Sequence, residues 1–291
     1  MQRIGFVGLG SMGLPMAKVL AAKGFAVTGF DLRAAAMQEL AGAGGKAADS
    51  VGDALAGADV AILMVVNAAQ AESVLFDSNA IARLAPGAVV AVMATCPPAK
   101  AQALAERVRA AGFGFVDAPV SGGVVGATAG ALTIRVGASN DDFSRAKGAL
   151  EAMGSKVAHV GDTPGAGSTA KAINQLLCGV HLAAAGEAMA LARKLGVDVS
   201  EILDIVSGSA ASSWMLRDRG PRMLEDNPRV TSAVDIFVKD LGIVLETAAE
   251  CGAETPLAAA AHERFKQASA AGLGAQDDSQ VTRAFGDLKK A

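Results

Sequence analysis

The N-terminal segment contains the residue types and spacing of a dinucleotide-binding site. Gly8, Gly10 and Gly13 form the pattern GxGxxG directly after a short apolar run, and Asp31 ends the next apolar run. In such a turn the first glycine permits a tight bend, the second lets backbone approach a pyrophosphate, and the third lets helix pack on strand. The phosphates would lie at the helix N-terminus, which favours anions. The predicted cofactor-binding residues of this segment are Gly8, Gly10, Ser11, Met12, Gly13 and Asp31.

Asp31 also bears on which nicotinamide cofactor would bind. A carboxylate at this position accepts hydrogen bonds from a ribose 2′-OH and repels a 2′-phosphate, which favours NAD over NADP. Arg33 follows two residues later and could pair with a 2′-phosphate, which would weaken that preference. We therefore expect NAD as the cofactor, with NADP as the alternative.

A second group of polar residues lies on an otherwise apolar segment. Lys171, Asn174, Gln175 and Cys178 are spaced so that a helix places them on one face. Polar side chains are costly to bury without partners, so these residues either face solvent or line a site. Oxidation of an alcohol needs a group that takes the hydroxyl proton, and a neutral lysine can do this. Ser168 is the expected N-cap, which would put Lys171 in the first helical turn, where the dipole disfavours its charge.

The segment DAPVSGG, residues 117–123, could bind an anion. The Ser121 hydroxyl and the backbone N–H groups of Gly122 and Gly123 can converge on one point, and such a set of donors suits a carboxylate. A glycine-rich β-turn that binds nothing fits the same residues, so both interpretations stay open at this point.

The elements that must position these residues follow from hydrophobic periodicity. Up to about residue 160, short apolar runs alternate with Ala-rich amphipathic segments, which predicts a mostly parallel, doubly wound Rossmann sheet covered on both faces. After the turn-rich break GDTPGAGS at residues 161–168, only helical spacing recurs. We predict an α/β fold with a dinucleotide-binding domain, residues 1–162, and a C-terminal all-α domain for substrate binding and oligomerisation, residues 163–291. The expected strands are 3–7, 25–30, 60–65, 89–93, 114–116, 132–136 and 156–160, and the expected helices are 11–23, 35–42, 69–76, 100–111, 141–153, 171–194, 200–207, 233–251 and 257–271.

The composition argues against several functional classes. A net charge of −3 without a basic run argues against nucleic-acid binding. The longest apolar segment, residues 168–194, contains several polar side chains, which indicates a buried helix rather than a membrane span. We expect no targeting segment, because the first strand begins at Arg3, and three widely spaced cysteines indicate reduced thiols in the cytoplasm. Cysteine and histidine never cluster at metal-ligand spacing, so no metal site is expected.

Four segments resemble the β-hydroxyacid dehydrogenase family, which includes 3-hydroxyisobutyrate dehydrogenase and tartronate semialdehyde reductase. They read GFVGLGSMGLPMA, DAPVSGG continuing as VVGATAGALTIRVGA, GAGSTAKAINQ, and FVKDLG. Their order and spacing match the family over essentially the whole chain. The resemblance implies an NAD(P)-dependent enzyme that transfers a hydride between nicotinamide and the carbinol of a small hydroxy acid.

The resemblance also implies roles for individual residues. Ser121, Gly122 and Gly123 would hold the substrate carboxylate. Lys171 would be the general acid/base, and Asn174 would orient the substrate.

Other expected site residues rest on weaker grounds. Gln175 stands where the family usually has a second asparagine, so its polar contact is open. The resemblance implies that Lys239 lies over the cofactor side of the cleft, although a surface ion pair also fits FVKDLG. Val65, Asn67 and Thr95 follow predicted strand ends, where open α/β sheets bind ligands, and family analogy places Thr95 near the nicotinamide.

The second half of the chain resembles the L-threonate dehydrogenase group in the segments INQLLCGVHLAAAGEAMALA, SSWM and SAVDIFVKDLG. This implies a small polyhydroxylated acid that is oxidised next to its carboxylate to a 2-oxo acid. Tartronate semialdehyde (2-hydroxy-3-oxopropionate) and 3-hydroxyisobutyrate are the alternative substrates. A non-catalytic NAD(P)-binding module and an imine reductase are alternatives from other classes, and the presence of Lys171 and Asn174 argues against both.

Three further expectations concern the helical half. Its Ala- and Gly-rich helices are expected to form a homo-oligomer, as in relatives, either a dimer or a tetramer. His181 is interpreted as a hydrogen-bonded core residue rather than a catalytic one. Trp214, the only tryptophan, would either close the substrate pocket or fill core or interface space.

Overall fold

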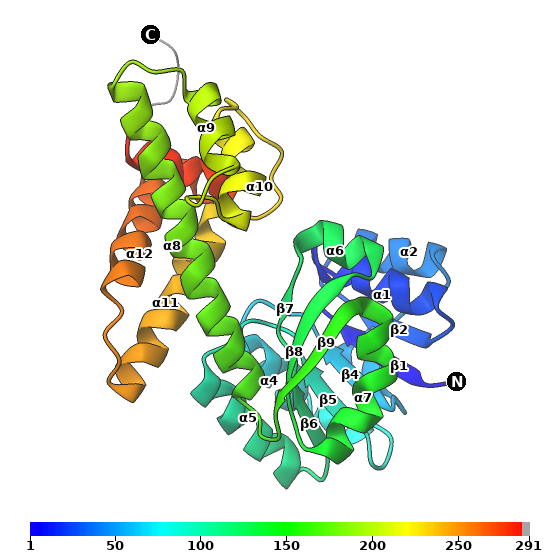
Figure 1. Cartoon of the computed structure of the whole chain (residues 1–291). Helices are drawn as coiled ribbons and strands as arrows, with labels where there is room; N and C mark the ends of the chain where they lie inside the picture. Colours follow the sequence, from blue (N-terminus) through cyan, green and yellow to red (C-terminus); the bar gives the residue numbers. More distant parts are fainter. Residues whose placement is uncertain (287–291) are drawn as a thin grey trace. The chain divides into compact units, whose positions relative to one another are not determined.

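A computed structural model describes residues 1–286, which form two compact units (Figure 1). Unit 1 comprises Met1–Lys171 and unit 2 begins at Ala172, so the division falls inside the long helix α8, Ala166–Lys194. The domain boundary predicted between residues 162 and 163 precedes this helix and stays a prediction.

Unit 1 is built on one sheet. Six strands are parallel in the order β3-β2-β1-β4-β5-β6, which is the order of the doubly wound dinucleotide-binding fold. Strand β8 continues the sheet antiparallel to β6, and it pairs with β7 and β9. The predicted α/β class is therefore confirmed. The strands are β1 (Arg3–Val7), β2 (Ala26–Phe30), β3 (Lys46–Ala47), β4 (Val60–Leu63), β5 (Val89–Val92), β6 (Gly114–Asp117), β7 (Val120–Ser121), β8 (Leu132–Gly137) and β9 (Gly154–Gly161).

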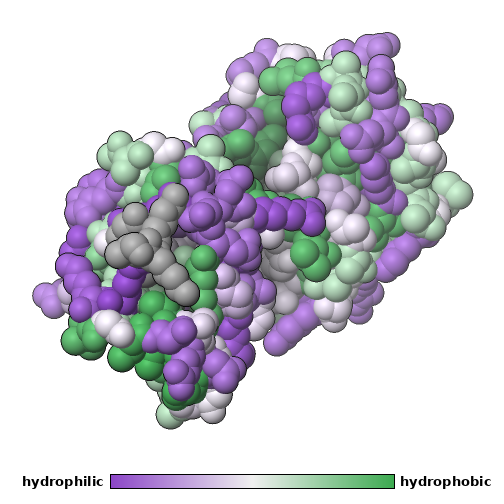
Figure 2. Space-filling view, turned by 90° about the horizontal axis from the view of Figure 1, so that it is seen from above, coloured by the Kyte–Doolittle hydropathy of each residue, from purple (hydrophilic) through white to green (hydrophobic). Residues whose placement is uncertain are grey.

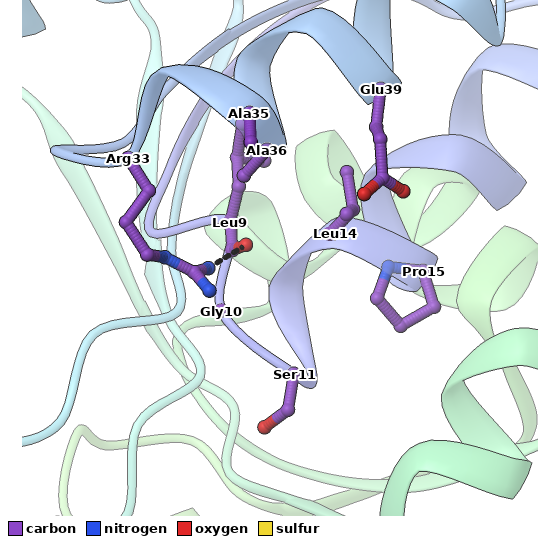
Figure 3. Close-up of a pocket in the computed structure, with 9 residues that line it drawn as sticks. All are labelled: Leu9, Gly10, Ser11, Leu14, Pro15, Arg33, Ala35, Ala36 and Glu39. Atoms are coloured by element: carbon purple, nitrogen blue, oxygen red, sulfur yellow. Dashed lines mark hydrogen bonds between the residues drawn. The ribbon is translucent and has the colours of Figure 1, made fainter.

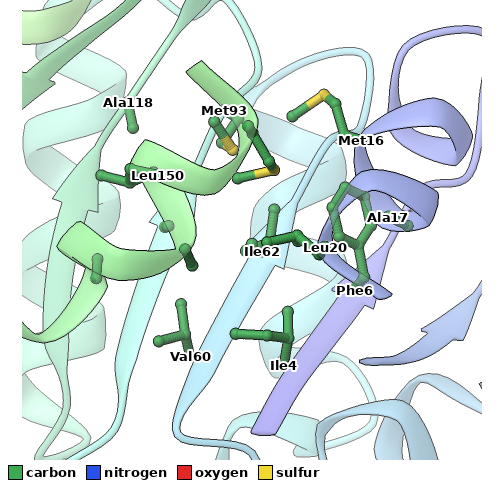
Figure 4. Packing of buried hydrophobic residues seen from close by; sticks show 14 of the residues in the cluster. Ile4, Phe6, Met16, Ala17, Leu20, Val60, Ile62, Met93, Ala118 and Leu150 are labelled. Carbon is green, nitrogen blue, oxygen red and sulfur yellow. The ribbon is translucent and has the colours of Figure 1, made fainter. Parts of the chain in front are cut away.

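Helices cover both faces of the sheet because its strands are apolar on both sides. Ile4 and Phe6 of β1 pack on one face against α1, where Met16 and Leu20 are fully buried (Figure 4). Val7, on the alternate face of β1, belongs to a second core beneath α3, α4 and α5. The helices of unit 1 are α1 (Gly13–Ala22), α2 (Ala34–Gly42), α3 (Val51–Leu55), α4 (Ala68–Phe76), η1 (Ala80–Arg83), α5 (Pro98–Ala110), α6 (Gly123–Ala129) and α7 (Asn140–Met153).

Unit 2 is helical, as predicted. Its core joins α8 from Ala172 onward with α11 and α12, and Phe237 of α11 stacks on Phe265 of α12. Figure 2 shows polar side chains mixed with apolar patches on the surface of this unit. After α8 the elements are α9 (Val199–Ser207), α10 (Trp214–Met223), α11 (Val234–Cys251), α12 (Pro256–Ala268), η2 (Ser269–Leu273) and η3 (Asp278–Ala284).

Helix α8 is also the one helix of residues 1–286 that is long and apolar enough to cross a membrane by length and composition alone. Half of its apolar window is buried inside the structure, which is common for the core helix of a globular protein.

Candidate active site

The turn after β1 has the geometry that the glycine pattern predicts. Gly8 has a φ of +93°, and a Cβ there would lie 2.5 Å from the carbonyl oxygen of Met64. A Cβ on Gly13, the first residue of α1, would lie 1.8 Å from the carbonyl oxygen of Gly8. A Cβ on Gly10 would meet no atom within 4 Å, so open space lies in front of this backbone segment. The turn is thus tight where helix and strand meet and open where a pyrophosphate would approach.

Asp31 lies at the end of β2 and is fixed beside this turn. Its carboxylate accepts hydrogen bonds from the backbone N–H of Leu9 (2.7 Å) and from the backbone N–H of Arg33 (2.9 Å). Burial raises the pKa of Asp31, but these N–H groups and the Arg33 guanidinium together lower it by more. The net shift of the pKa is downward, and the carboxylate stays ionised. Arg33 also donates to the carbonyl oxygen of Leu9 (2.6 Å) and lines a hollow beside Gly10 and Ser11 (Figure 3).

These features fit a dinucleotide cofactor. The open space at Gly10 is the cradle that a side chain would fill, and the ionised Asp31 is an acceptor for ribose hydroxyls. Met12, half-buried, is the N-cap residue of α1, and no side chain caps this helix terminus, which is the kind of terminus that favours phosphate oxygens.

The other predicted cofactor contacts lie after neighbouring strands at the same edge of the sheet. Val65 follows β4 and Thr95 follows β5, and both are half-buried. Asn67 also follows β4, but its side chain caps α4 by accepting the backbone N–H of Gln70 (2.9 Å). Its side-chain oxygen therefore already has a structural partner.

A second turn follows β6 and leads through β7 into α6. Gly122 has a φ of +129° and Gly123 has a φ of +59°, conformations that side-chain-bearing residues rarely adopt. Both glycines are exposed, whereas Ser121 is half-buried. The turn thus exposes backbone N–H groups next to the Ser121 hydroxyl.

Lys171 reaches this second turn. Its Nζ donates to Ser121 Oγ at 3.2 Å, and the lysine is only 6 % exposed. The structure therefore brings together two residues that are 50 positions apart in the chain and that the sequence analysis assigned to one site.

Arg135 is a neighbour of this site that the sequence analysis missed. Its Nη1 donates to Ser121 Oγ at 3.0 Å, so two basic side chains share one hydroxyl oxygen. A signal was available: Leu132, Ile134 and Val136 alternate as core residues of β8, which turns Arg135 toward the other face.

The start of α8 corrects one sequence-based expectation. The helix begins at Ala166, so Ser168 is not its N-cap, and Lys171 lies in the second turn, where the dipole acts more weakly. Ser168 instead binds the buried Asp117 through its backbone N–H and its hydroxyl (both 2.7 Å). Gly165 N–H donates to the same carboxylate (3.0 Å). Asp117 therefore anchors the first turn of the helix that carries Lys171.

The remaining predicted polar residues form a chain of hydrogen bonds within unit 2. Asn174 Nδ2 donates to Gln175 Oε1 (2.9 Å) and to Cys178 Sγ (3.3 Å). Gln175 Nε2 donates to Asp240 Oδ2 (2.6 Å), and Lys239 pairs with Asp240 Oδ1 (2.8 Å). Gln175 and Asp240 are buried and Lys239 is half-buried, so only the lysine of this ion pair reaches solvent. Gln175 fixes the amide of Asn174. The placement of Lys239 over a cofactor stays a prediction.

Two further residues of the helical unit are exposed rather than buried in its core. His181 is exposed on α8 and is therefore not a core residue of unit 2. Trp214 is 61 % exposed and does not fill the core of this unit. Among residues 1–286, no group of three or more His, Cys, Asp or Glu side chains is arranged to hold a metal ion.

Two family models match the chain. The NAD binding domain of 6-phosphogluconate dehydrogenase matches residues 3–161, which is more than half of the chain. The NAD-binding domain of NADP-dependent 3-hydroxyisobutyrate dehydrogenase matches residues 165–285. The chain belongs to the β-hydroxyacid dehydrogenase family. The resemblance seen in the four sequence segments is thereby confirmed.

Relatives of this β-hydroxyacid dehydrogenase cover almost its whole length. It is 45 % identical to the L-threonate dehydrogenase of Cupriavidus necator, over 98 % of this chain and 96 % of that protein. It is 41 % identical to the L-threonate dehydrogenase of Escherichia coli K12, over 98 % and 95 %. The crystal structure of 3-hydroxyisobutyrate dehydrogenase from Salmonella typhimurium is 42 % identical and superposes with a TM-score of 0.90, over 98 % and 100 %. The chain is accordingly an NAD(P)-dependent dehydrogenase of small hydroxy acids.

Proposed function

We propose that this enzyme oxidises L-threonate next to its carboxylate to the 2-oxo acid, with NAD as the hydride acceptor. The observation that carries the proposal is the contact of the buried Lys171 Nζ with Ser121 Oγ, at the turn that exposes Gly122 and Gly123. It places a proton acceptor beside donors for a carboxylate, as oxidation at the neighbouring carbon requires. The likeness to L-threonate dehydrogenases supports this choice of acid.

In this proposal the residues of the second turn hold the substrate. The Ser121 hydroxyl and the N–H groups of Gly122 and Gly123 donate to the carboxylate. In its neutral form, Lys171 takes the hydroxyl proton as the bond from carbon to hydrogen breaks. In reduction of a 2-oxo acid, the same lysine returns the proton.

Asn174 is proposed to orient the substrate hydroxyl. Its amide nitrogen donates to Gln175 and Cys178, and these contacts fix the plane of the amide that would meet the substrate. Gln175 then acts on the amide of Asn174 rather than on the substrate, because its own amide nitrogen binds Asp240.

The cofactor is proposed to be held by the first turn and by Asp31. The adenosine ribose would lie at Asp31, and the pyrophosphate would lie against the first turn, at Gly8, Gly10, Ser11, Met12 and Gly13. The nicotinamide would lie toward Val65, Asn67 and Thr95. Lys239 is proposed as a further contact. A bound nicotinamide supplies the hydride acceptor for the alcohol carbon. Because Asp31 is ionised, its charge favours NAD over NADP.

A second candidate substrate is 3-hydroxyisobutyrate, which the close structural likeness to the Salmonella enzyme favours. The two acids differ in the position of the reacting carbinol, which is next to the carboxylate in L-threonate and one carbon further in 3-hydroxyisobutyrate. They also differ in the groups around it, where a single methyl or hydroxyl changes discrimination by about 10–200-fold. A panel of L-threonate, 3-hydroxyisobutyrate and glycerate with NAD and with NADP, plus tartronate semialdehyde with the reduced cofactors, tests the proposal. We expect the highest kcat/KM for L-threonate with NAD. Faster turnover of another acid would refute the substrate, and tight cofactor binding without turnover of any acid would indicate a non-catalytic module.

We further propose that the enzyme is a homo-oligomer in the cytoplasm. Leu191 and Leu195 of α8 and Ile205 of α9 are 58 %, 70 % and 57 % exposed, and a subunit interface would bury such side chains. None of Cys96, Cys178 and Cys251 is in a disulfide. Light scattering should give at least twice the chain mass of 29.0 kDa, and a monomer would contradict the proposal.

A further inference from the structure

Arg135 lies on the same face of the sheet as the proposed carboxylate site. In the antiparallel pair of β7 and β8, Ser121 is opposite Thr133, and Arg135 is two residues further along β8. Side chains two residues apart on a strand share a face, so the Arg135 side chain extends diagonally across to Ser121. Its Nη1 lies 3.0 Å from Ser121 Oγ, and the arginine is half-buried.

The two donors determine what the Ser121 hydroxyl can do. A hydroxyl oxygen has two lone pairs and one hydrogen. Arg135 and Lys171 both donate to this oxygen, at 3.0 Å and 3.2 Å, and together they use both lone pairs. The remaining O–H hydrogen is therefore available for an acceptor other than these two side chains. This arrangement makes Ser121 a directed donor, which suits an anionic oxygen.

The two basic side chains differ in whether their positive charge is permanent. Lys171 must be neutral to accept the hydroxyl proton, so its positive charge is absent when the Michaelis complex is ready to react. Arginine has no acceptor and keeps its proton in proteins. Of the two side chains on Ser121, only Arg135 can then supply a positive charge in the reactive state.

We propose that Arg135 is a specificity-determining residue that supplies the permanent positive charge of the carboxylate site and fixes the Ser121 hydroxyl as a donor to it. The proposal rests on the proposed function in that the ligand is the carboxylate of a hydroxy acid. It assigns to Arg135 the selection of acids over the corresponding neutral alcohols.

Three other ionisable residues of unit 1 lie on the strands around this site. Lys156 of β9 stands opposite Thr133 on the same face and is exposed to solvent. His159 of β9 lies on the alternate face and contacts Phe143 and the carbonyl oxygen of Ala138. The carboxylate of Asp117 accepts hydrogen bonds from the N–H groups of Gly165 and Ser168 at the start of α8. Of these three residues, only Lys156 adds positive charge on the face of the sheet that carries Arg135, and its charge is exposed to solvent.

The test compares Arg135→Met, Arg135→Lys and the control Arg109→Met, which removes a positive charge from an exposed position of α5. Steady-state turnover of L-threonate is measured with NAD at pH 7. We expect Arg135→Met to raise KM for L-threonate by about tenfold, the loss of one charged hydrogen bond, with a smaller change in kcat. Arg135→Lys should restore most of the affinity, and Arg109→Met should match the wild type.

A second readout separates this inference from the proposed function. Calorimetric titration of L-threonate into the enzyme with NADH needs no turnover. If the wild type binds L-threonate but does not oxidise it, the proposed function fails, while weaker binding by Arg135→Met still supports the carboxylate site. Unchanged KM and binding in Arg135→Met, or an equal loss in Arg109→Met, would overturn the inference. So would a wild type that binds no hydroxy acid.

Discussion

Two turns of unit 1 are each suited to an anion, but they are built differently. The turn after β1 presents backbone, and its shape depends on Gly8 and Gly13, whose missing side chains let strand and helix meet. The turn after β6 presents the Ser121 hydroxyl with two basic side chains on it, Arg135 and Lys171. The first turn has no lysine or arginine of its own between its glycines.

The difference corresponds to the two ligands proposed for these turns. A cofactor pyrophosphate needs a fixed cradle, and N–H groups at a helix terminus supply it without a titrating group. A hydroxy-acid substrate has a carboxylate that needs positive charge or donors, and a carbinol that must give up its hydroxyl proton. A site for it therefore combines a charged group with a group that can change its protonation. The comparison predicts that substitutions in the first turn affect cofactor binding, whereas those in the second affect substrate binding or the chemical step.

The largest effect is expected for Lys171→Ala. Removing the proton acceptor should lower kcat by about 10²–10⁴-fold, the usual contribution of a general acid/base. Stopped-flow and steady-state turnover with L-threonate measure this, and NAD binding should stay near the wild-type value. Near wild-type turnover would break the assignment of proton chemistry to the second turn.

The next largest effect is expected for Gly13→Ala. A Cβ would lie 1.8 Å from the Gly8 carbonyl oxygen, so α1 must move away from β1. Overpacking of this kind costs about 1–3 kcal/mol, and we expect NAD affinity to fall by about 10–100-fold. The control Gly148→Ala lies on α7, where a Cβ meets no atom within 4 Å. Equal NAD binding by both variants would contradict the role of the first turn.

A smaller effect is expected for Asp31→Asn. The substitution removes the charge that would repel a 2′-phosphate, so the ratio of kcat/KM for NAD to that for NADP should fall by about tenfold. Asp49→Asn, at an exposed position of unit 1, is the matched control. An unchanged ratio would show that Asp31 does not decide cofactor preference.

The smallest effect concerns Asp117, which anchors the helix that carries Lys171. Burial raises the pKa of Asp117 to about 6, although N–H and hydroxyl donors of Ser168 and the N–H of Gly165 oppose this. The folded state therefore binds the proton more tightly than the unfolded chain, and ionisation destabilises the fold as pH rises from about 4 to 6. This group should lower the free energy of unfolding by about 1 kcal/mol between pH 5 and pH 7.

Urea unfolding of the wild type, Asp117→Asn and the exposed control Asp204→Asn at both pH values measures this term. In Asp117→Asn, the decrease in the free energy of unfolding between pH 5 and pH 7 that is due to Asp117 should disappear. In Asp204→Asn it should remain. An identical pH dependence in all three proteins would contradict the assignment.

How much the sequence reveals also differs between the two turns. The first turn is local: strand, glycines, helix and Asp31 lie within one stretch, and the predicted β1 matches Arg3–Val7. The second turn depends on contacts between distant residues, because Asp117 holds Ser168 across 51 positions and Arg135 meets Ser121 only through the pairing of β7 with β8. Hydrophobic periodicity carries no information on such pairings, so the start of α8 at Ala166 and the contact of Arg135 with Ser121 were not predicted. Helix α10 was also missed, since it contains Gly220 and Pro221, which usually interrupt helices.

The most direct test of the account is chemical rescue of Lys171→Ala by small amines. With NAD and L-threonate present, methylamine should restore turnover, and a series of amines should restore it in proportion to their basicity, because the missing group is a proton acceptor. The effect should saturate with amine concentration while cofactor binding stays constant. Turnover that does not respond to any amine, in a variant that still binds NAD and L-threonate, would contradict the claim that Lys171 moves the proton at the second turn.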